Sequence, residues 1–132
     1  MNIKDFVESI HYKGRSLDEL KNENVSALKK GLVNLERHIQ NVKKFGLPVA
    51  VAVNHFIKDT DNEVKALIDF CDNLGVKASL CTHWANGGEG TKELAAHVSE
   101  LCEKDEAKFQ FLYESKTPLF KKIETIAKEI YR

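Results

Sequence analysis

The chain of 132 residues has no excess of either charge, no long apolar run and only 3 cysteines. Its 20 basic and 20 acidic residues cancel, so no overall field favours nucleic acid or an anionic membrane as a partner. The longest apolar run, residues 47–53, is far too short to cross a bilayer. The N-terminal residues also lack the basic and apolar blocks of a signal peptide. We therefore expect a cytoplasmic protein without a nucleic-acid or membrane partner.

Cysteine and histidine are too sparse and too scattered to predict a disulfide framework or a metal site. Cys71, Cys81 and Cys102 are odd in number and show no CxxC spacing, which fits buried thiols in a reducing compartment. The histidines do not share metal-ligand spacing either. The phosphate-binding patterns GxxxxGKS and GxxxxGKT are also missing, so the sequence carries no such signal for nucleotide phosphates.

What the sequence does contain is helical periodicity in several separate segments. Apolar residues recur every three or four positions over 24–45, 59–75 and 91–103, which predicts three amphipathic helices. A fourth helix is expected to have Pro118 at its first position, where proline is favoured. Its predicted inner face consists of Phe120, Ile123, Ile126, Ala127 and Ile130.

Short apolar runs lie between these helices and predict strands. Residues 49–53 and 76–81 suit strands that are buried on both faces, and residues 109–113 are a third candidate. The alternation of strands and helices predicts the α/β class, as a three-layer Rossmann-like domain with a short parallel sheet flanked by helices. Residues 1–15 are weakly patterned, so this domain is expected to span residues 16–132.

Polar and aromatic side chains follow the two clearest strands at the points where the strands end. In an open parallel sheet, ligands bind at the carboxyl ends of the strands, which places Asn54, Phe56, Thr82 and Trp84 along one rim. The two aromatic side chains suit stacking on a planar ligand, and they suit packing under their own loops about equally well. The amide of Asn54 suits the edge of a purine-like ring, but a turn asparagine that bonds its own backbone is the commoner case.

The glycine-rich stretch at residues 87–90 predicts a flexible loop in front of a helix. Its backbone amides are able to approach a ligand, and a helix start favours anions. The negative charge of Glu89 would repel a phosphate, so a ribose or pterin edge is an equally good neighbour. His55 and His83 lie at the two strand exits and are candidates for the same site, although surface turn histidines are the simpler interpretation.

Several stretches stand in a specific order and spacing. They are LVNLERHI at 32–39, KFGLPV at 44–49, VNHF at 53–56 with DTD at 59–61, HWANGGEG at 83–90, FLY at 111–113 and KIETIAKEIY at 122–131. Together they resemble the formate–tetrahydrofolate ligase family, and the resemblance covers nearly the whole chain, from Leu17 to Tyr131.

The resemblance implies an ATP-dependent ligation of formate to tetrahydrofolate by way of formyl phosphate. ATP with Mg, formate and tetrahydrofolate are then the substrates, and no covalently bound cofactor is implied. Phe56 and Trp84 are expected to sandwich the pterin ring, and Leu80 to line the same pocket, while no catalytic residue is assigned. Further residues are expected to line the nucleotide side or the cleft: Asn54, His55, Thr82, His83, Gly87, Gly88, Glu89 and Gly90.

Two departures from the family limit what the resemblance implies. The family's phosphate-binding loop belongs to a much earlier segment, and family members continue past the position of Tyr131. The chain is therefore expected to carry the folate side of a cleft and to be inactive by itself. Three interpretations stay open: a portion of the ligase that needs the other segments, a non-catalytic folate- or nucleotide-binding module, and a remnant that self-associates through open sheet edges.

Overall fold

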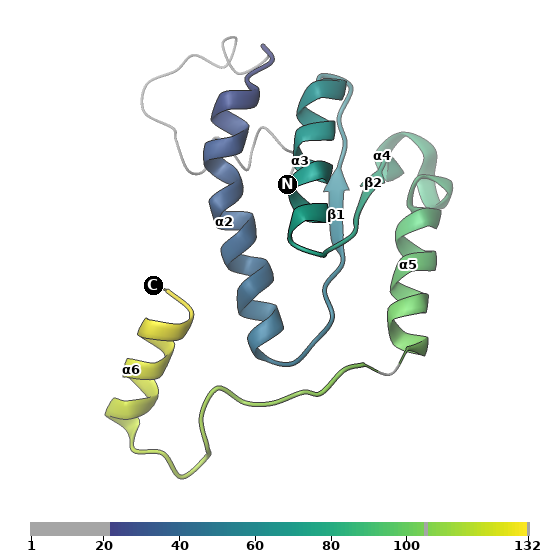
Figure 1. Cartoon of the computed structure of the whole chain (residues 1–132). Coiled ribbons are helices and arrows are strands. Elements are labelled where there is room, and N and C mark those ends of the chain that lie inside the picture. Colours follow the sequence, from purple (N-terminus) through teal and green to yellow (C-terminus); the bar gives the residue numbers. More distant parts are fainter. Residues whose placement is uncertain (1–21, 105, 132) are drawn as a thin grey trace.

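The computed structural model describes residues 22–104 and 106–131, so the predicted domain boundary at residue 15 lies outside the described residues. The strands β1 (Val51–Asn54) and β2 (Ala78–Cys81) pair in parallel, with Val51 opposite Ala78 and Asn54 opposite Cys81. The other elements are α2 (Val25–Lys44), α3 (Asp61–Asn73), α4 (His83–Asn86), the 3-10 helix η2 (Gly87–Thr91), α5 (Lys92–Glu103) and α6 (Leu119–Glu129) (Figure 1). A short parallel sheet flanked by helices confirms the predicted α/β class.

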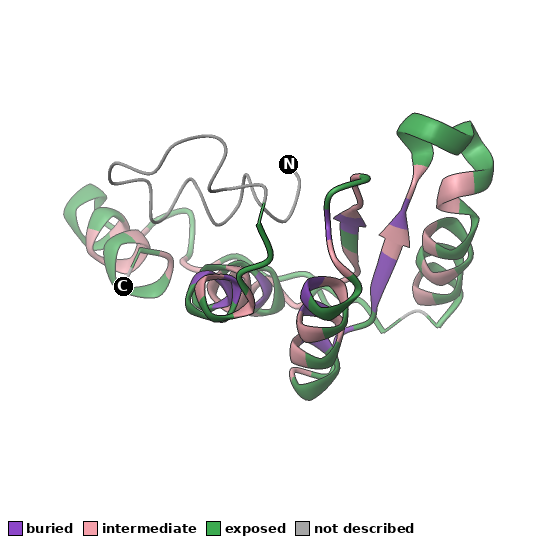
Figure 2. Ribbon diagram, turned by 90° about the horizontal axis from the view of Figure 1, so that it is seen from above, coloured by how far each residue is buried: buried purple, intermediate pink, exposed green. Residues whose placement is uncertain are grey.

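The sheet separates two helical layers. Apolar residues of α2 and α3 pack against one face of the sheet, and the core consists of Leu28, Leu32, Val53, Leu67, Cys71 and Ala78. Helix α5 contacts β2 and lies on the other side of the sheet from α3 (Figure 2). The carboxyl ends of both strands are therefore held between helices at one end of the molecule, where the predicted rim lies.

Side-chain caps fix where α2 and α3 begin. The Asn24 side chain accepts a hydrogen bond from the backbone N–H of Ala27, and Thr60 and Glu63 form a reciprocal capping box at the start of α3. The Glu63 carboxylate, which is buried, also accepts from the backbone N–H of Asn24 at 2.9 Å. One carboxylate thus ties the two helix starts together and holds α2 beside α3.

The sheet is smaller and more exposed than predicted. Within the described part of the chain it has two strands, because residues 109–113 run across the end of α2 instead of joining the sheet. The backbone N–H groups of Lys108 and Gln110 donate to the carbonyls of Gly46 and Phe45 at 2.8 and 2.9 Å. The prediction that β1 is buried on both faces is also wrong, since Ala52 is exposed.

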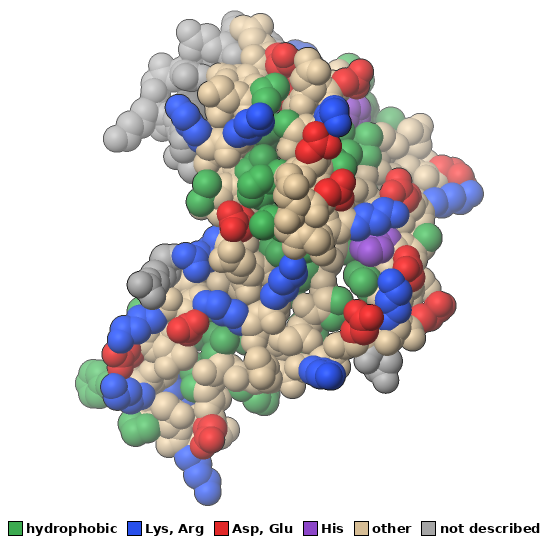
Figure 3. All heavy atoms as spheres, in the orientation of Figure 1, with side chains coloured by type: hydrophobic (Ala, Val, Ile, Leu, Met, Phe, Trp, Pro, Cys, Tyr) green, Lys and Arg blue, Asp and Glu red, His purple; other side chains and the backbone are tan. Residues whose placement is uncertain are grey.

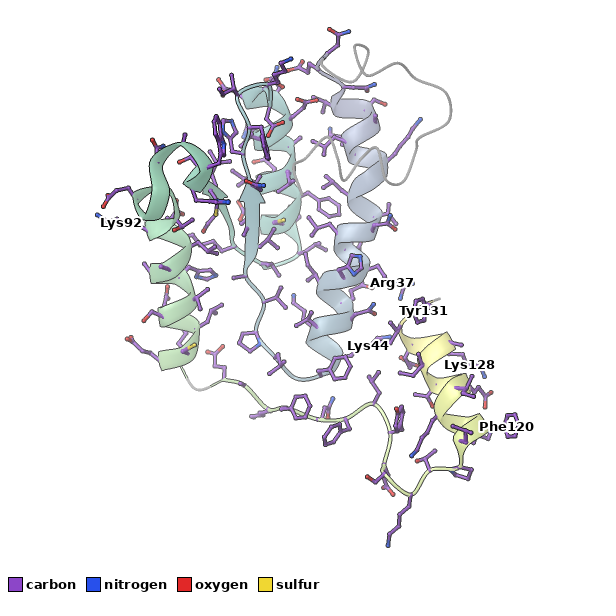
Figure 4. The ribbon with its side chains drawn as sticks, turned by 180° about the vertical axis from the view of Figure 1, so that it is seen from behind. Arg37, Lys44, Lys92, Phe120, Lys128 and Tyr131 are labelled. Carbon is purple, nitrogen blue, oxygen red and sulfur yellow. The ribbon has the colours of Figure 1, made fainter. Side chains whose placement is uncertain are left out.

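Helix α6 begins at Leu119, one residue later than predicted, with Pro118 as its N-cap. None of its residues is buried, and Phe120 and Ile123 of its predicted inner face are 84% and 56% exposed. Apolar side chains gather on the free side of this helix (Figure 3), and Phe120 points away from the rest of the chain (Figure 4). The predicted inner face is wrong because polar contacts hold the helix: Lys44 pairs with Glu129 at 2.8 Å, and the Asn41 amide donates to the Ile130 carbonyl.

The prediction of buried thiols holds for two of the three cysteines. Cys71 and Cys81 are buried, whereas Cys102 is exposed because it lies on the solvent side of α5. None of the helices in the described ranges is long and apolar enough to cross a membrane.

Candidate functional site

The two strand exits meet through an aromatic pair, Phe56 and Trp84. Their ring centroids lie 6.0 Å apart with an interplanar angle of 12°, so the rings are stacked. The indole Nε1–H of Trp84 donates to the carbonyl oxygen of His55 at 2.7 Å, and the backbone N–H of His55 donates to the Cys81 carbonyl at 3.0 Å. The structure therefore brings together the two aromatic side chains that the sequence placed on one rim.

A tight turn after β1 presents Phe56. The backbone N–H of Phe56 donates to the Asp59 carboxylate at 2.8 Å, and the backbone N–H of Asp59 donates back to the Phe56 carbonyl at 2.9 Å. Asp59 is 8% exposed, which is unusual for a carboxylate and reflects these bonds. The sequence placed Asp59 only at the start of a predicted helix and did not reveal its hydrogen bonds to the backbone of Phe56. Its place three residues after Phe56, in the turn that follows β1, was the available signal.

Helices α4 and η2 present Trp84. The predicted flexible loop at residues 87–90 is instead part of the 3-10 helix η2, and this turn is closed by hydrogen bonds. The Asn86 amide donates to the Thr82 hydroxyl at 2.9 Å, and the backbone N–H of Thr82 donates to the Gly90 carbonyl at 3.0 Å. The glycines therefore allow a compact turn to fold back onto the end of β2.

Gly90 is required by close approach of the backbone. A Cβ atom at this position would lie 2.6 Å from the carbonyl carbon of Thr82, which is closer than van der Waals contact allows. At Gly88 a Cβ atom would meet nothing within 4 Å. The two glycines thus have different roles, although the sequence pattern did not distinguish them.

The other predicted site residues surround this aromatic pair to different degrees. Asn54 ends β1 and is half-buried, and its side chain makes no hydrogen bond to its own backbone. Leu80 packs against the core from the neighbouring strand. Glu89 pairs with Lys92 at 2.7 Å in solvent. His55 is half-buried, whereas three further candidates are exposed: His83, Gly87 and Gly88.

The thiol of Cys81, at the end of β2, is not activated as a nucleophile. Burial raises the pKa of Cys81, and the negative charge of Glu93 raises it further. Cys81 is therefore a neutral side chain at physiological pH, without the thiolate that nucleophilic chemistry needs. Within residues 22–104 and 106–131, no group of three or more His, Cys, Asp and Glu residues is placed to hold a metal ion.

One further open groove lies away from this site. It has a volume of about 610 Å³ between α2 and α3, and Leu32 and Phe70 contribute apolar surface to its lining. None of the residues that line it belongs to the rim, so the groove has no part in the candidate site.

The fold and the site define a class: an α/β domain whose parallel strands end in a stacked aromatic pair and a glycine turn. The family model described as formate–tetrahydrofolate ligase matches residues 5–132, and the chain belongs to that family. It is 85% identical over 119 residues to the formate–tetrahydrofolate ligase of Pelagibacter ubique, and 54% identical over 119 residues to that of Hyphomonas neptunium. The formate–tetrahydrofolate ligase of Sinorhizobium medicae is 52% identical over 118 residues.

These matches cover most of the chain but only part of each relative. They include 90% of the chain for the first two relatives and 89% for the third, but 21% of each relative's own length. The chain thus spans about a fifth of the length of the curated relatives it matches.

Proposed function

We propose that this chain supplies the folate side of the cleft in a cytoplasmic ATP-dependent formate–tetrahydrofolate ligase. The observation that carries the proposal is the parallel aromatic pair Phe56 and Trp84 at the carboxyl ends of the strands, in a chain of this family. Two near-parallel rings are the geometry that holds a flat ring system by stacking on both sides. The pterin ring of tetrahydrofolate is such a ring system.

The distance between the rings specifies how the ligand enters. A third ring between two others needs about 7–8 Å, since each stacked layer occupies about 3.5–4 Å. The observed centroid distance of 6.0 Å is shorter, so the pair must part by about 1–2 Å to admit a pterin. The hydrogen bond between the indole of Trp84 and the His55 carbonyl resists that movement, whereas Phe56 lies on the turn that precedes α3.

In the complete reaction, a formate oxygen attacks the γ-phosphorus of ATP, formyl phosphate forms and ADP leaves. The folate amine then attacks the formyl carbon, phosphate leaves, and 10-formyltetrahydrofolate is released. The residues of this chain bind and orient the folate for the second step. Phosphate handling belongs to other segments of the ligase, and we expect the chain alone to be inactive.

Titration of the chain with tetrahydrofolate tests the proposal, because Trp84 is its single tryptophan. We expect the ligand to change the fluorescence of Trp84, while ATP alone leaves it unchanged. Trp84→Ala should weaken binding by about 1–3 kcal/mol in calorimetry, since one stacking face is lost. Phe111→Ala, which removes an exposed ring outside the rim, is the matched control and should bind normally. The proposal fails if neither fluorescence nor heat reports binding to the unaltered chain.

Self-association is a second candidate property, and the free apolar side of α6 favours it. Leu119, Phe120 and Ile123 are all more than half exposed on this helix. Large exposed apolar side chains that gather in one place commonly mark contact surfaces. Sedimentation velocity at several concentrations should show association that Phe120→Ser reduces. A monomer at every concentration would contradict this second candidate.

A further inference from the structure

The geometry points to Asn54 as the specificity-determining residue of the aromatic-pair site. We infer that its side-chain amide binds the polar edge of the ring system that Phe56 and Trp84 stack against. The inference rests on the proposed function, and it names the contact by which the site distinguishes a pterin from other flat ligands.

The hydrogen bonding of Asn54 itself supports this role. Its Oδ1 atom is buried and accepts no hydrogen bond, and no bond of its amide group is present within the described residues. A buried acceptor without a partner destabilises the fold, and native proteins rarely leave one. The turn asparagine that bonds its own backbone is thus not what the structure contains. An amide with only a structural role would have a hydrogen-bond partner within the fold.

Other polar groups at the two strand exits already have hydrogen-bond partners within the fold. The Asp59 carboxylate accepts the N–H of Phe56, the Thr82 hydroxyl accepts the amide of Asn86, and the indole N–H of Trp84 donates to a backbone carbonyl. These groups are occupied in holding the two aromatic rings in place. Asn54 is half-buried, and the buried oxygen of its side chain has no such role.

The position of Asn54 in the fold also supports this role. Asn54 is the last residue of β1, and the next residue, His55, supplies the carbonyl that anchors Trp84. Side chains alternate along a strand, so Asn54 lies on the opposite face from Val53, whose side chain is in the core. The amide therefore lies at the carboxyl end of β1, on the face of the sheet away from the core that α2 and α3 cover.

Three other described residues have buried polar atoms without partners, and each lies elsewhere. Ser79 lies inside β2, His97 lies on α5, and Asn41 lies on α2 with its amide nitrogen bonded to Ile130. None of them follows a strand exit. Asn41 is chemically identical to Asn54 and far from the rim in the chain, so it provides a matched control.

The chemistry of the amide defines the ligand edge. Asn offers one acceptor and two donors in a plane, which fits a ring edge that presents a donor next to an acceptor. The 2-amino-4-oxo edge of a pterin has this pattern, and its exocyclic amino group is the natural donor to Oδ1. A site built to bond such a group discriminates strongly against an analogue that lacks it.

The test measures the affinity of the chain for tetrahydrofolate and for an analogue that lacks the 2-amino group. It is carried out with the unaltered chain, with Asn54→Leu and Asn54→Asp, and with the control Asn41→Leu. We expect unaltered chain and the control to prefer tetrahydrofolate. In Asn54→Leu, tetrahydrofolate binding should weaken by about 10–100-fold and the preference should disappear. Thermal unfolding supplies a readout that a structural role would move: Asn54→Leu removes an unpaired buried oxygen, so its unfolding temperature should equal or exceed that of the unaltered chain.

The outcomes separate the inference from the proposed function. If unaltered chain binds tetrahydrofolate and both Asn54 variants bind it equally well with the same preference, the inference is wrong and the folate site stands. Asn54→Leu that unfolds at a lower temperature, yet keeps both the affinity and the preference for tetrahydrofolate, would assign Asn54 a structural role and overturn the inference. If the unaltered chain binds neither ligand, both the proposed function and the inference are wrong.

Discussion

Trp84 illustrates how much of the candidate site depends on individual side chains and on their backbone neighbours. Its ring stacks on Phe56, and its N–H is held by the carbonyl of His55. The sequence was sufficient to predict that both rings lie on one rim, because each follows a parallel strand. It did not predict that the rings contact each other, or that Asp59 fixes one of them, since these depend on turn geometry that periodicity does not encode.

Gly90 is the glycine of this site whose substitution the structure predicts to be costly. Gly90→Ala places a Cβ atom 2.6 Å from the backbone of Thr82, so the turn that carries Trp84 must shift. We expect the free energy of unfolding to fall by about 1–3 kcal/mol in urea denaturation. Gly88→Ala, with open space around the new methyl group, should stay within about 0.5 kcal/mol of the unaltered chain. Equal losses for the two variants would contradict the packing that we describe.

At the scale of helices and strands, apolar periodicity predicted α2, α3 and α5 close to their observed bounds. Helices α2 and α3 bury apolar residues, whereas no residue of α5 is buried. It failed for residues 109–113, whose alternation is compatible with a strand but whose backbone bonds the loop after α2. It also assigned an inner face to α6 that the structure leaves exposed. Periodicity reports which side of an element is apolar, but it does not report whether a partner covers that side.

Helix α6 carries a pH-dependent contact of its own. Lys121 and Lys128 both bond the carboxylate of Glu124, and together they lower its pKa from 4.5 to about 2. A lowered pKa means that the contact stabilises the helix above about pH 4.5 and that this stabilisation is lost as the pH falls toward 2. Circular dichroism should therefore show loss of helix in that range, and NMR should show a low carboxyl titration for Glu124.

Glu124→Gln provides the control for this contact. The variant has no carboxylate to titrate, so it should lack the part of the acid transition that belongs to α6. A titration of Glu124 near its ordinary pKa in the unaltered chain would contradict the assigned contacts.

At the scale of the whole molecule, the accessibility of the three thiols to a reagent shows how well the core is enclosed. Cys71 is buried, and burial together with the charge of Asp72 raises its pKa to about 11, while Cys81 is buried beside β1. Iodoacetamide at about pH 8 should therefore modify Cys102 in the native chain and leave the other two unmodified until urea is added. Peptide mass spectrometry reads the sites directly. Rapid native labelling of Cys71 would mean that the core is open.

The chain as a whole belongs to the formate–tetrahydrofolate ligase family and spans about a fifth of the length of its curated relatives. The series of motifs along the chain, including those at the strand exits, was sufficient to identify that family from the sequence. The same motifs do not define the state of the aromatic pair, because the 6.0 Å distance between the rings depends on the turns on both sides. Whether the pair opens around a pterin is therefore the central question about function.

Intermolecular nuclear Overhauser effects between bound tetrahydrofolate and the aromatic protons of the chain test this central claim most directly. If the chain carries the folate side of the cleft, the pterin protons should show contacts to both the Phe56 ring and the Trp84 indole. Bound tetrahydrofolate with contacts to neither ring would contradict the account.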